Sequence, residues 1–160
     1  MKKTMQWALL GLVGLLAFTG CATTTNNGYS KQKVVYHVNY DDPKQQTGAL
    51  RNIQNHINAV GADKLDLKVV VHGNGLSMVL YPEAQARTKL PRGNADEAVR
   101  AQLRGLREQG VQFQVCANTV RSKGVTVAED LFDVDGADVV PSGVVALAEL
   151  QSAGYAYIKP

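Results

Sequence analysis

Short runs of β-branched residues alternate with helix-length segments of regular apolar spacing along most of this chain. The run Val69–Val71 is apolar without interruption, which is typical of a strand covered on both faces of a parallel sheet. The alternation predicts a single α/β domain in which a parallel five-stranded sheet carries helices on both faces. The expected strands are Val34–Asn39, Leu67–His72, Val111–Cys116, Ala137–Val140 and Tyr155–Ile158.

Capping residues place the helices between these strands. The first helix is expected to end at Gly61, after apolar residues spaced by three and four at Leu50, Ile53, Ile57 and Val60. Asn94, with Glu97 three residues later, predicts the start of a second helix that ends at Gly110. Before it, a short apolar piece, Leu76–Leu80, is followed by a polar stretch through Pro82 and Pro91 that we interpret as a loop.

Two further helices are expected in the last third of the chain. Thr126 and Glu129 form a capping-box pattern for a short helix that ends near Phe132. Pro141 and Ser142 begin the last helix, which Gly154 ends. Apolar residues cover this helix on most sides, which predicts burial against the sheet or against a neighbouring subunit; they are Val144, Val145, Leu147, Ala148 and Leu150.

The first 20 residues have the pattern of an export signal. Lys2 and Lys3 precede an apolar run, Trp7–Phe18, that is shorter than the roughly 20 residues a membrane-spanning helix needs. Thr19 and Gly20 then lead directly to Cys21. Without this segment the chain keeps enough residues for one packed core.

This N-terminal pattern resembles a bacterial lipoprotein signal. The resemblance implies that diacylglycerol is attached to Cys21, that residues 1–20 are removed, and that the new amino group takes a fatty acid such as palmitate. Ordinary signal cleavage or an uncleaved anchor is the alternative, because Phe18 stands where an aliphatic residue is usual. Ala22, rather than aspartate, follows the cysteine, so the resemblance favours the outer membrane, facing the periplasm, in a Gram-negative cell.

The expected domain organisation therefore has three parts. Residues 1–20 form the signal peptide, residues 21–32 form a flexible tether, and residues 33–160 form the folded domain. The formal charge of the whole chain is +3, and the removed segment carries Lys2 and Lys3 and no acidic residue, so the mature domain is nearly neutral. This charge balance argues against a nucleic-acid partner.

Reactive groups in an open parallel sheet gather beyond the carboxyl ends of the strands. Cys116 ends one expected strand, directly before Asn118 and Thr119, which could cap the next turn. Such a position, with Arg121 and Lys123 nearby, can lower the pKa of a thiol and favour the nucleophilic thiolate. A single cysteine at the end of an apolar strand is, however, more often an inert buried residue.

His72 and the three residues after it are weaker candidates at the same edge. His72 could donate or accept a proton near the thiol, or it could be a structural histidine. Gly73, Asn74 and Gly75 could cradle an anion, but they lack the lysine and the spacing of a phosphate loop and also suit an ordinary turn.

No metal or cofactor is expected. His37 lies inside a strand and His56 lies on a helix, so they do not have the spacing of a metal-binding pair. The carboxylates Asp133, Asp135 and Asp138 lack the spacing of a known metal loop and fit a solvated loop better.

Four segments in order resemble the DsrE/DsrF-like family, which is related to sulfur-oxidation and sulfur-relay proteins. They are Val71–Gly75, Gly110–Thr119, Val140–Val145 and Gly154–Pro160, and the resemblance covers Lys33–Pro160. It implies an α/β domain with a parallel five-stranded sheet that often assembles into trimers or hexamers. In sulfur-relay members a cysteine carries sulfur as a persulfide, and only Cys116 can take that role in the folded domain.

These observations leave three hypotheses. The first is a membrane-anchored sulfur carrier whose Cys116 accepts sulfane sulfur from a donor and passes it to a partner protein or a small thiol. The second is a non-enzymatic binding or assembly module of the periplasm in which Cys116 is structural. The third is a redox-sensing thiol that oxidises reversibly.

Overall fold

The computed structural model of the chain describes residues 28–160. The predicted signal peptide, Cys21 and most of the predicted tether lie outside these residues. Within the described part, no helix is both long and apolar enough to cross a membrane.

A five-stranded, all-parallel sheet forms the centre of the described domain, in the order β4-β3-β2-β1-β5. The fold class predicted from the alternating pattern is therefore confirmed. The strands are β1 (Gln32–Val38), β2 (Leu65–Val71), β3 (Gln112–Cys116), β4 (Val139–Val140) and β5 (Ala156–Ile158). The helices are α1 (Pro43–Val60), α2 (Glu97–Glu108), α3 (Ala117–Lys123), α4 (Val127–Asp130) and α5 (Gly143–Ser152).

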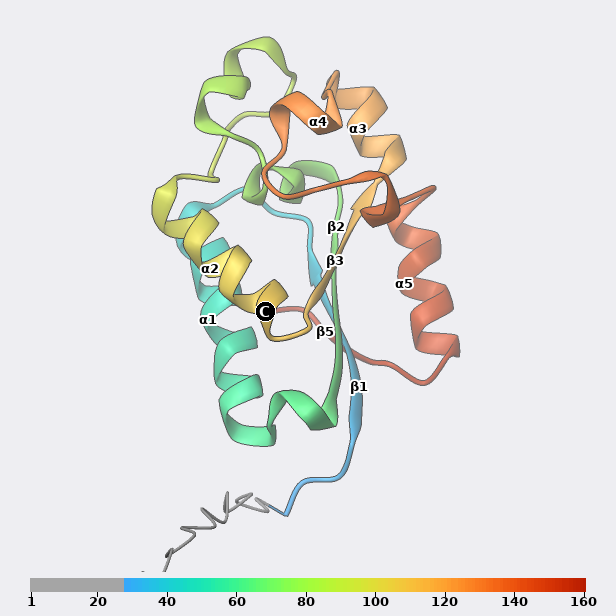
Figure 1. Cartoon of the computed structure of the whole chain (residues 1–160). Coiled ribbons are helices and arrows are strands. Elements are labelled where there is room, and N and C mark those ends of the chain that lie inside the picture. The colour runs from blue at the N-terminus through green and yellow to red at the C-terminus, as the bar shows by residue number, and fades with distance from the viewer. Residues whose placement is uncertain (1–27) are drawn as a thin grey trace, which may run out of the picture.

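The two faces of the sheet are covered unequally. Helices α1 and α2 lie on one face and α5 lies alone on the other, as Figure 1 shows. The α1/α2 face holds the larger core, in which Leu50, Ile53 and Phe113 are almost fully buried. The smaller core under α5 consists of Val35, Val70, Leu147 and Tyr155. Successive residues of a strand point to opposite faces, so Val35 and Val70 mark the α5 face of β1 and β2.

The carboxyl ends of the strands meet at one edge, beneath the loops and short helices drawn at the top of Figure 1. Segments that we expected to be loops are 3₁₀ helices there, at Gly73–Met78 and Pro82–Arg87. Gly75 belongs to the first of these, and its backbone lies directly against the end of β1: an added Cβ would lie 2.7 Å from the carbonyl carbon of Val38. Only glycine allows the chain to pass this close.

One predicted cap is wrong, and a second predicted cap, Thr126, begins its helix without the expected capping box. The N-cap of α2 is Asp96, whose carboxylate accepts a hydrogen bond from the Val99 N–H at 2.9 Å. Asn94 instead donates its side-chain amide to Gln46 Oε1, at 2.8 Å, so a tertiary contact displaces the local cap. Thr126 precedes α4, but its backbone N–H donates to the Asp130 carboxylate at 2.7 Å and Glu129 makes no capping box.

The last helix keeps part of its apolar surface exposed. On the side of α5 that faces the sheet, Gly143 and Leu147 are buried. On its outer side, Val144 and Val145 are 65% and 57% exposed. An apolar groove of about 320 Å³ runs beside them, lined in part by Val140, Pro141 and Leu150. Leu147 is thus buried against the sheet, as expected, while burial of the exposed valines against a neighbouring subunit stays a prediction.

Candidate functional site

Four polar side chains follow one another across the carboxyl edge of the sheet, one from each of four neighbouring strands. Cys116 is the last residue of β3, His72 directly follows β2, His37 lies near the end of β1, and Tyr157 lies in β5. His37 and His72 come two residues after Val35 and Val70, so alternation places both on the α5 face. The strands β3, β2, β1 and β5 are consecutive neighbours in the sheet, so the four side chains form a row across it. We call Cys116, His72, His37 and Tyr157 the polar row.

Cys116 lies where two helices begin. It is the N-cap residue of α3, and the polar groups that act on its sulfur are the backbone N–H groups of Asn118 and Thr119, the Thr119 hydroxyl, and the backbone N–H of Gly143 at the start of α5. The Thr119 hydroxyl also accepts a hydrogen bond from the Gly73 N–H at 2.8 Å, which ties the loop after β2 to the thiol.

These donors determine the acidity of the thiol. Burial acts to raise the pKa of Cys116, but the hydrogen bonds from Gly143, Thr119 and Asn118 outweigh it and lower the pKa below the usual value for cysteine. The thiol is free and its residue is only 5% exposed. The site therefore favours a thiolate while leaving it a narrow approach from solvent.

Gly143 lies between Cys116 and His72. Its N–H donates to the thiol, and a Cβ added to it would lie 2.9 Å from the His72 Cβ and 3.2 Å from the Cγ and Cδ2 atoms of the ring. The absence of a side chain at Gly143 therefore lets the start of α5 approach both residues at once.

His37 connects His72 to Tyr157. Its Nε2 atom lies 2.7 Å from the Nε2 atom of His72, and its Nδ1 atom lies 2.6 Å from the Tyr157 hydroxyl. The two imidazole rings are stacked, with centroids 4.8 Å apart and planes inclined by 15°. One proton can be shared between two facing Nε2 atoms, so the short distance requires at least one neutral ring.

The surroundings favour neutral imidazoles. Burial, then the charge of His72 and the charge of Lys159, lower the pKa of His37 to about 4. Burial and the charge of Lys159 also lower the pKa of His72. At neutral pH both rings are therefore uncharged, and each can donate with one nitrogen and accept with the other.

The remaining predicted site residues lie around the thiol. Asn118 and Thr119 supply two of its backbone donors. The Gly73 and Gly75 N–H groups already donate, to Thr119 Oγ1 and to the His72 carbonyl, and the Asn74 side chain accepts from Lys123. Anion binding by these three residues stays a prediction, as do the roles of Cys116 and His72.

The acidic loop has a structural partner. Arg107 contacts Asp133 at 3.2 Å and Asp138 at 3.0 Å, and Asp135 caps a short 3₁₀ helix with its side chain. Within residues 28–160, no group of three histidine, cysteine or acidic side chains is arranged to hold a metal ion.

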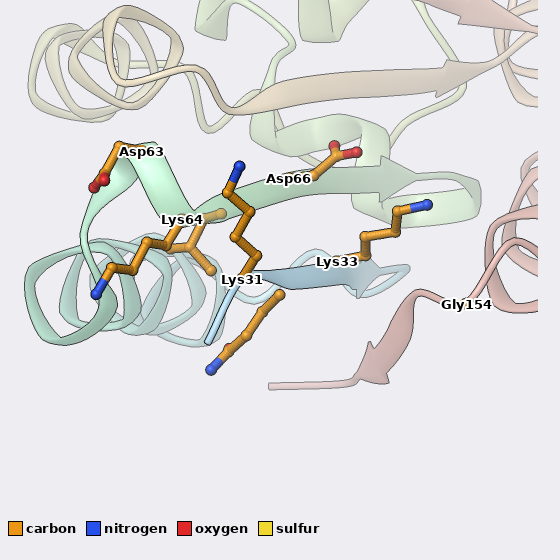
Figure 2. Close-up of a pocket in the computed structure, with 8 residues that line it drawn as sticks. Lys31, Lys33, Asp63, Lys64, Asp66 and Gly154 are labelled. Atoms are coloured by element: carbon orange, nitrogen blue, oxygen red, sulfur yellow. The ribbon is translucent and has the colours of Figure 1, made fainter. Parts of the chain in front are cut away.

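A charged hollow lies at the opposite, amino edge of the sheet (Figure 2). It has a volume of about 540 Å³, and charged side chains surround it, among them Lys31, Lys33, Lys64, Asp63 and Asp66. It contains none of the nucleophilic or imidazole side chains found at the carboxyl edge.

Comparisons with known proteins give a family and a fold. The model of the DsrE/DsrF-like family matches residues 32–160. A solved structure of MTH1491, a protein of unknown function from Methanobacterium thermoautotrophicum, is 27% identical, with a TM-score of 0.65 over 81% of this chain and 100% of that one. The crystal structure of the ychN protein from E. coli is 16% identical, with a TM-score of 0.55 over 82% and 100%. No curated protein sequence matches the chain.

Proposed function

Because the chain belongs to the DsrE/DsrF-like family, we propose that its folded domain accepts sulfane sulfur as a persulfide on Cys116 and passes it to a partner protein or a small thiol. The family supports a function related to sulfur relay. The observation that carries the proposal is the set of four hydrogen-bond donors on the Cys116 sulfur, at the start of two helices.

The chemistry needs no cofactor and no second cysteine. The Cys116 thiolate attacks the terminal sulfur of a persulfide R–S–S–H, a new S–S bond forms, and the donor S–S bond breaks with its electron pair leaving on R–S⁻. An acceptor thiolate then attacks the terminal sulfur on Cys116, and the Cys116 thiolate leaves. The four donors lower the energy of this thiolate, both as attacking group and as leaving group.

Mass analysis of the full chain in mild detergent tests the proposal. Cys21→Ser is the background for this test, because it leaves Cys116 as the one thiol of the chain. After exposure to glutathione persulfide, we expect one added sulfur atom that is removed by reduction and is missing when Cys116→Ser is added. Sulfur that remains after Cys116→Ser, or a Cys21→Ser protein that gains none, contradicts the proposal.

Lipid attachment at Cys21 would hold this domain at a membrane, in the outer membrane facing the periplasm for a Gram-negative host. The support is the sequence pattern of residues 1–21 alone. Labelled palmitate should enter the wild-type chain in cells, and Cys21→Ser should remain unlabelled and leave the membrane fraction. Equal labelling of the two proteins contradicts the lipid anchor.

The second candidate is an assembly module, favoured by the exposed apolar surface of α5. Val144 and Val145 are mostly exposed beside the apolar groove, and the buried Gln114 Oε1 atom that lines this groove has no hydrogen-bond partner. A second copy packed on α5 would cover this surface. We expect Val145→Asp to convert a homo-oligomer to monomers in sedimentation, and this candidate as the whole function requires that Cys116→Ala leave activity in cells unchanged.

A further inference from the structure

The polar row contains a hydrogen-bonded chain that leads from solvent to the neighbourhood of Cys116. The Tyr157 side chain is exposed, with 42% of the residue accessible, while His37 is 8% exposed and Cys116 is 5% exposed. The two links, Tyr157 to His37 and His37 to His72, measure 2.6 and 2.7 Å. Gly143 then connects the chain to the thiol, because its backbone packs against the His72 side chain and its N–H acts on the Cys116 sulfur.

Two opposite proton arrangements fit this chain. If the Tyr157 hydroxyl donates to His37 Nδ1, then His37 Nε2–H donates to His72 Nε2, and His72 carries its proton on Nδ1. If His72 Nε2–H donates instead, His37 Nδ1–H donates to the Tyr157 oxygen. A proton that leaves His72 Nδ1 is thus replaced from the Tyr157 end, and no ring has to hold a charge in the resting state.

We infer that Tyr157, His37 and His72 form a proton relay that protonates the thiolate leaving the sulfur donor at Cys116. The inference rests on the proposed function. His72 is the residue that gives the proton, and His37 and Tyr157 are positioning residues that supply it from solvent.

The relay balances the transfer step. The Cys116 thiolate takes the terminal S–H group of R–S–S–H, the departing R–S⁻ takes one proton from His72, and the products are Cys116–S–S–H and R–S–H. One proton from solvent then enters at Tyr157, which leaves the relay in the second arrangement. Return of the two rings and the hydroxyl to the first arrangement completes the cycle. A departing alkyl thiolate is a strong base in a buried site, so its protonation lowers the barrier to its release.

The groups that act on the relay are few. The rings of His37 and His72 interact with each other, with Tyr157 and with the positive charge of Lys159. Gly143, which packs against His72 from α5, has no titratable group. On β3 the titratable group is Cys116. No carboxylate is recorded among these partners in residues 28–160. The rings therefore act as neutral donors at neutral pH rather than as one arm of an ion pair.

A second tyrosine–histidine pair provides a matched control on the other face of the sheet. The Tyr36 hydroxyl lies 3.1 Å from His56 Nδ1, and His56 Nε2 lies 2.8 Å from Gln32 Oε1. Tyr36→Phe removes the same hydroxyl–imidazole bond as Tyr157→Phe, but away from Cys116.

The test compares two reactions of Cys116 in the full chain carrying Cys21→Ser, in mild detergent, so that Cys116 is the one thiol present. In the reaction with glutathione persulfide the leaving group is a basic thiolate, which needs a proton. In the reaction with iodoacetamide the leaving group is iodide, which needs none. We expect Tyr157→Phe and His37→Gln to slow sulfur loading about tenfold and to change its pH profile between about pH 4 and 6.5, while alkylation keeps its wild-type rate. Tyr36→Phe should match the wild type in both reactions.

The outcomes separate the relay from the proposed function. If the wild type forms no persulfide on Cys116, the proposed function and the relay both fail. If it loads sulfur and Tyr157→Phe loads it at the rate of Tyr36→Phe, the relay alone is overturned. Equal slowing of loading and alkylation by Tyr157→Phe also overturns it, because that result means a structural effect on the thiol. Tyr157 is exposed, so its variant keeps the test valid if His37→Gln fails to fold.

Discussion

The two edges of the same sheet hold polar groups of different kinds. At the carboxyl edge, backbone N–H groups and the Thr119 hydroxyl act on one buried sulfur, and two neutral imidazoles, His37 and His72, lie in the same polar row. At the amino edge, three lysines and two aspartates surround an open hollow (Figure 2). The first edge has little open volume and a strongly perturbed environment, while the second has the volume and full contact with water.

This contrast shows that an open hollow is a poor guide to reactivity in this fold. Charges in water are screened and interact weakly, whereas dipoles fixed around a desolvated atom shift its protonation. Parallel strands bring their carboxyl ends and the starts of the following helices to one edge, so the fixed N–H dipoles gather there. The chemistry is expected at the edge where backbone geometry, rather than side-chain charge, supplies the electrostatic field.

The largest expected effect comes from breaking the backbone packing of the carboxyl edge. Gly75→Ala would place a Cβ 2.9 Å from the Asn39 Cα and closer still to the Val38 carbonyl. We expect it to lower the free energy of unfolding by about 3 kcal/mol in urea denaturation, because neither backbone atom can move freely. Gly105→Ala, in α2, has nothing within 4 Å and is the control. A Gly75→Ala protein as stable as the control would mean that this close approach is not needed.

The second-largest effect is expected from acid, which should lower the free energy of unfolding through His37 at the carboxyl edge. The pKa of His37 is lowered from the usual imidazole value of 6.5 to about 4 in the folded chain. Between these two pH values His37 is protonated in the unfolded chain but not in the folded chain. Stability is therefore complete above about pH 6.5 and falls as the pH drops towards 4, by at most about 3 kcal/mol. Urea denaturation at several pH values measures this loss. His37→Gln should reduce the slope, and His56→Gln should do so less; an unchanged slope in His37→Gln contradicts the assignment.

Much of this edge could be predicted from the sequence. The end of β2 follows from an uninterrupted apolar run and the end of β3 from a run in which apolar residues alternate with glutamines, and the rule that parallel strands end at one edge singles out His72 and Cys116. Their neighbours Asn118 and Thr119 were predicted to cap a turn. The structure makes Cys116 itself the N-cap of α3, so these residues donate to the sulfur through their backbone N–H groups.

His37 and Tyr157 were missed for a physical reason. They are 120 residues apart in the chain, and they meet only because β5, the last strand, pairs with β1, the first. The strand order is a tertiary property that no local pattern encodes. A period-two signal was present, because His37 follows Val35 and His72 follows Val70 by two residues, which puts both rings on one face once those strands are paired. Asn94 failed as a cap for a similar reason, since its contact with Gln46 is tertiary.

A smaller effect is expected from one hydroxyl beside the thiol. Thr119→Val removes a donor to Cys116 and the acceptor of the Gly73 N–H. The thiol pKa should rise, so alkylation by iodoacetamide should need a higher pH. The unpaired Gly73 N–H should also cost about 1 to 2 kcal/mol of stability. Thr119→Ser, which keeps the hydroxyl, should leave the pH profile near that of the wild type. If Thr119→Val and Thr119→Ser have the same pH profile of alkylation, the Thr119 hydroxyl does not contribute to the acidity of the thiol.

The smallest effect is expected at the amino edge. Asp66 accepts a hydrogen bond from the Tyr155 hydroxyl and pairs with Lys68 at 3.4 Å, and its side chain is 46% exposed. Asp66→Asn keeps an acceptor for the tyrosine and loses only a charge that water already screens, so we expect a loss of about 0.5 kcal/mol in urea denaturation. Burial and Asp66 raise the pKa of Tyr155 to about 12, so the variant should bring that pKa down and make the tyrosine titrate earlier in alkali. The rate of Cys116 alkylation should not change, because the carboxylate acts at the other end of the strands. A changed alkylation rate would show that the two edges are coupled through the sheet, and the separation between a reactive edge and a solvated edge would then fail.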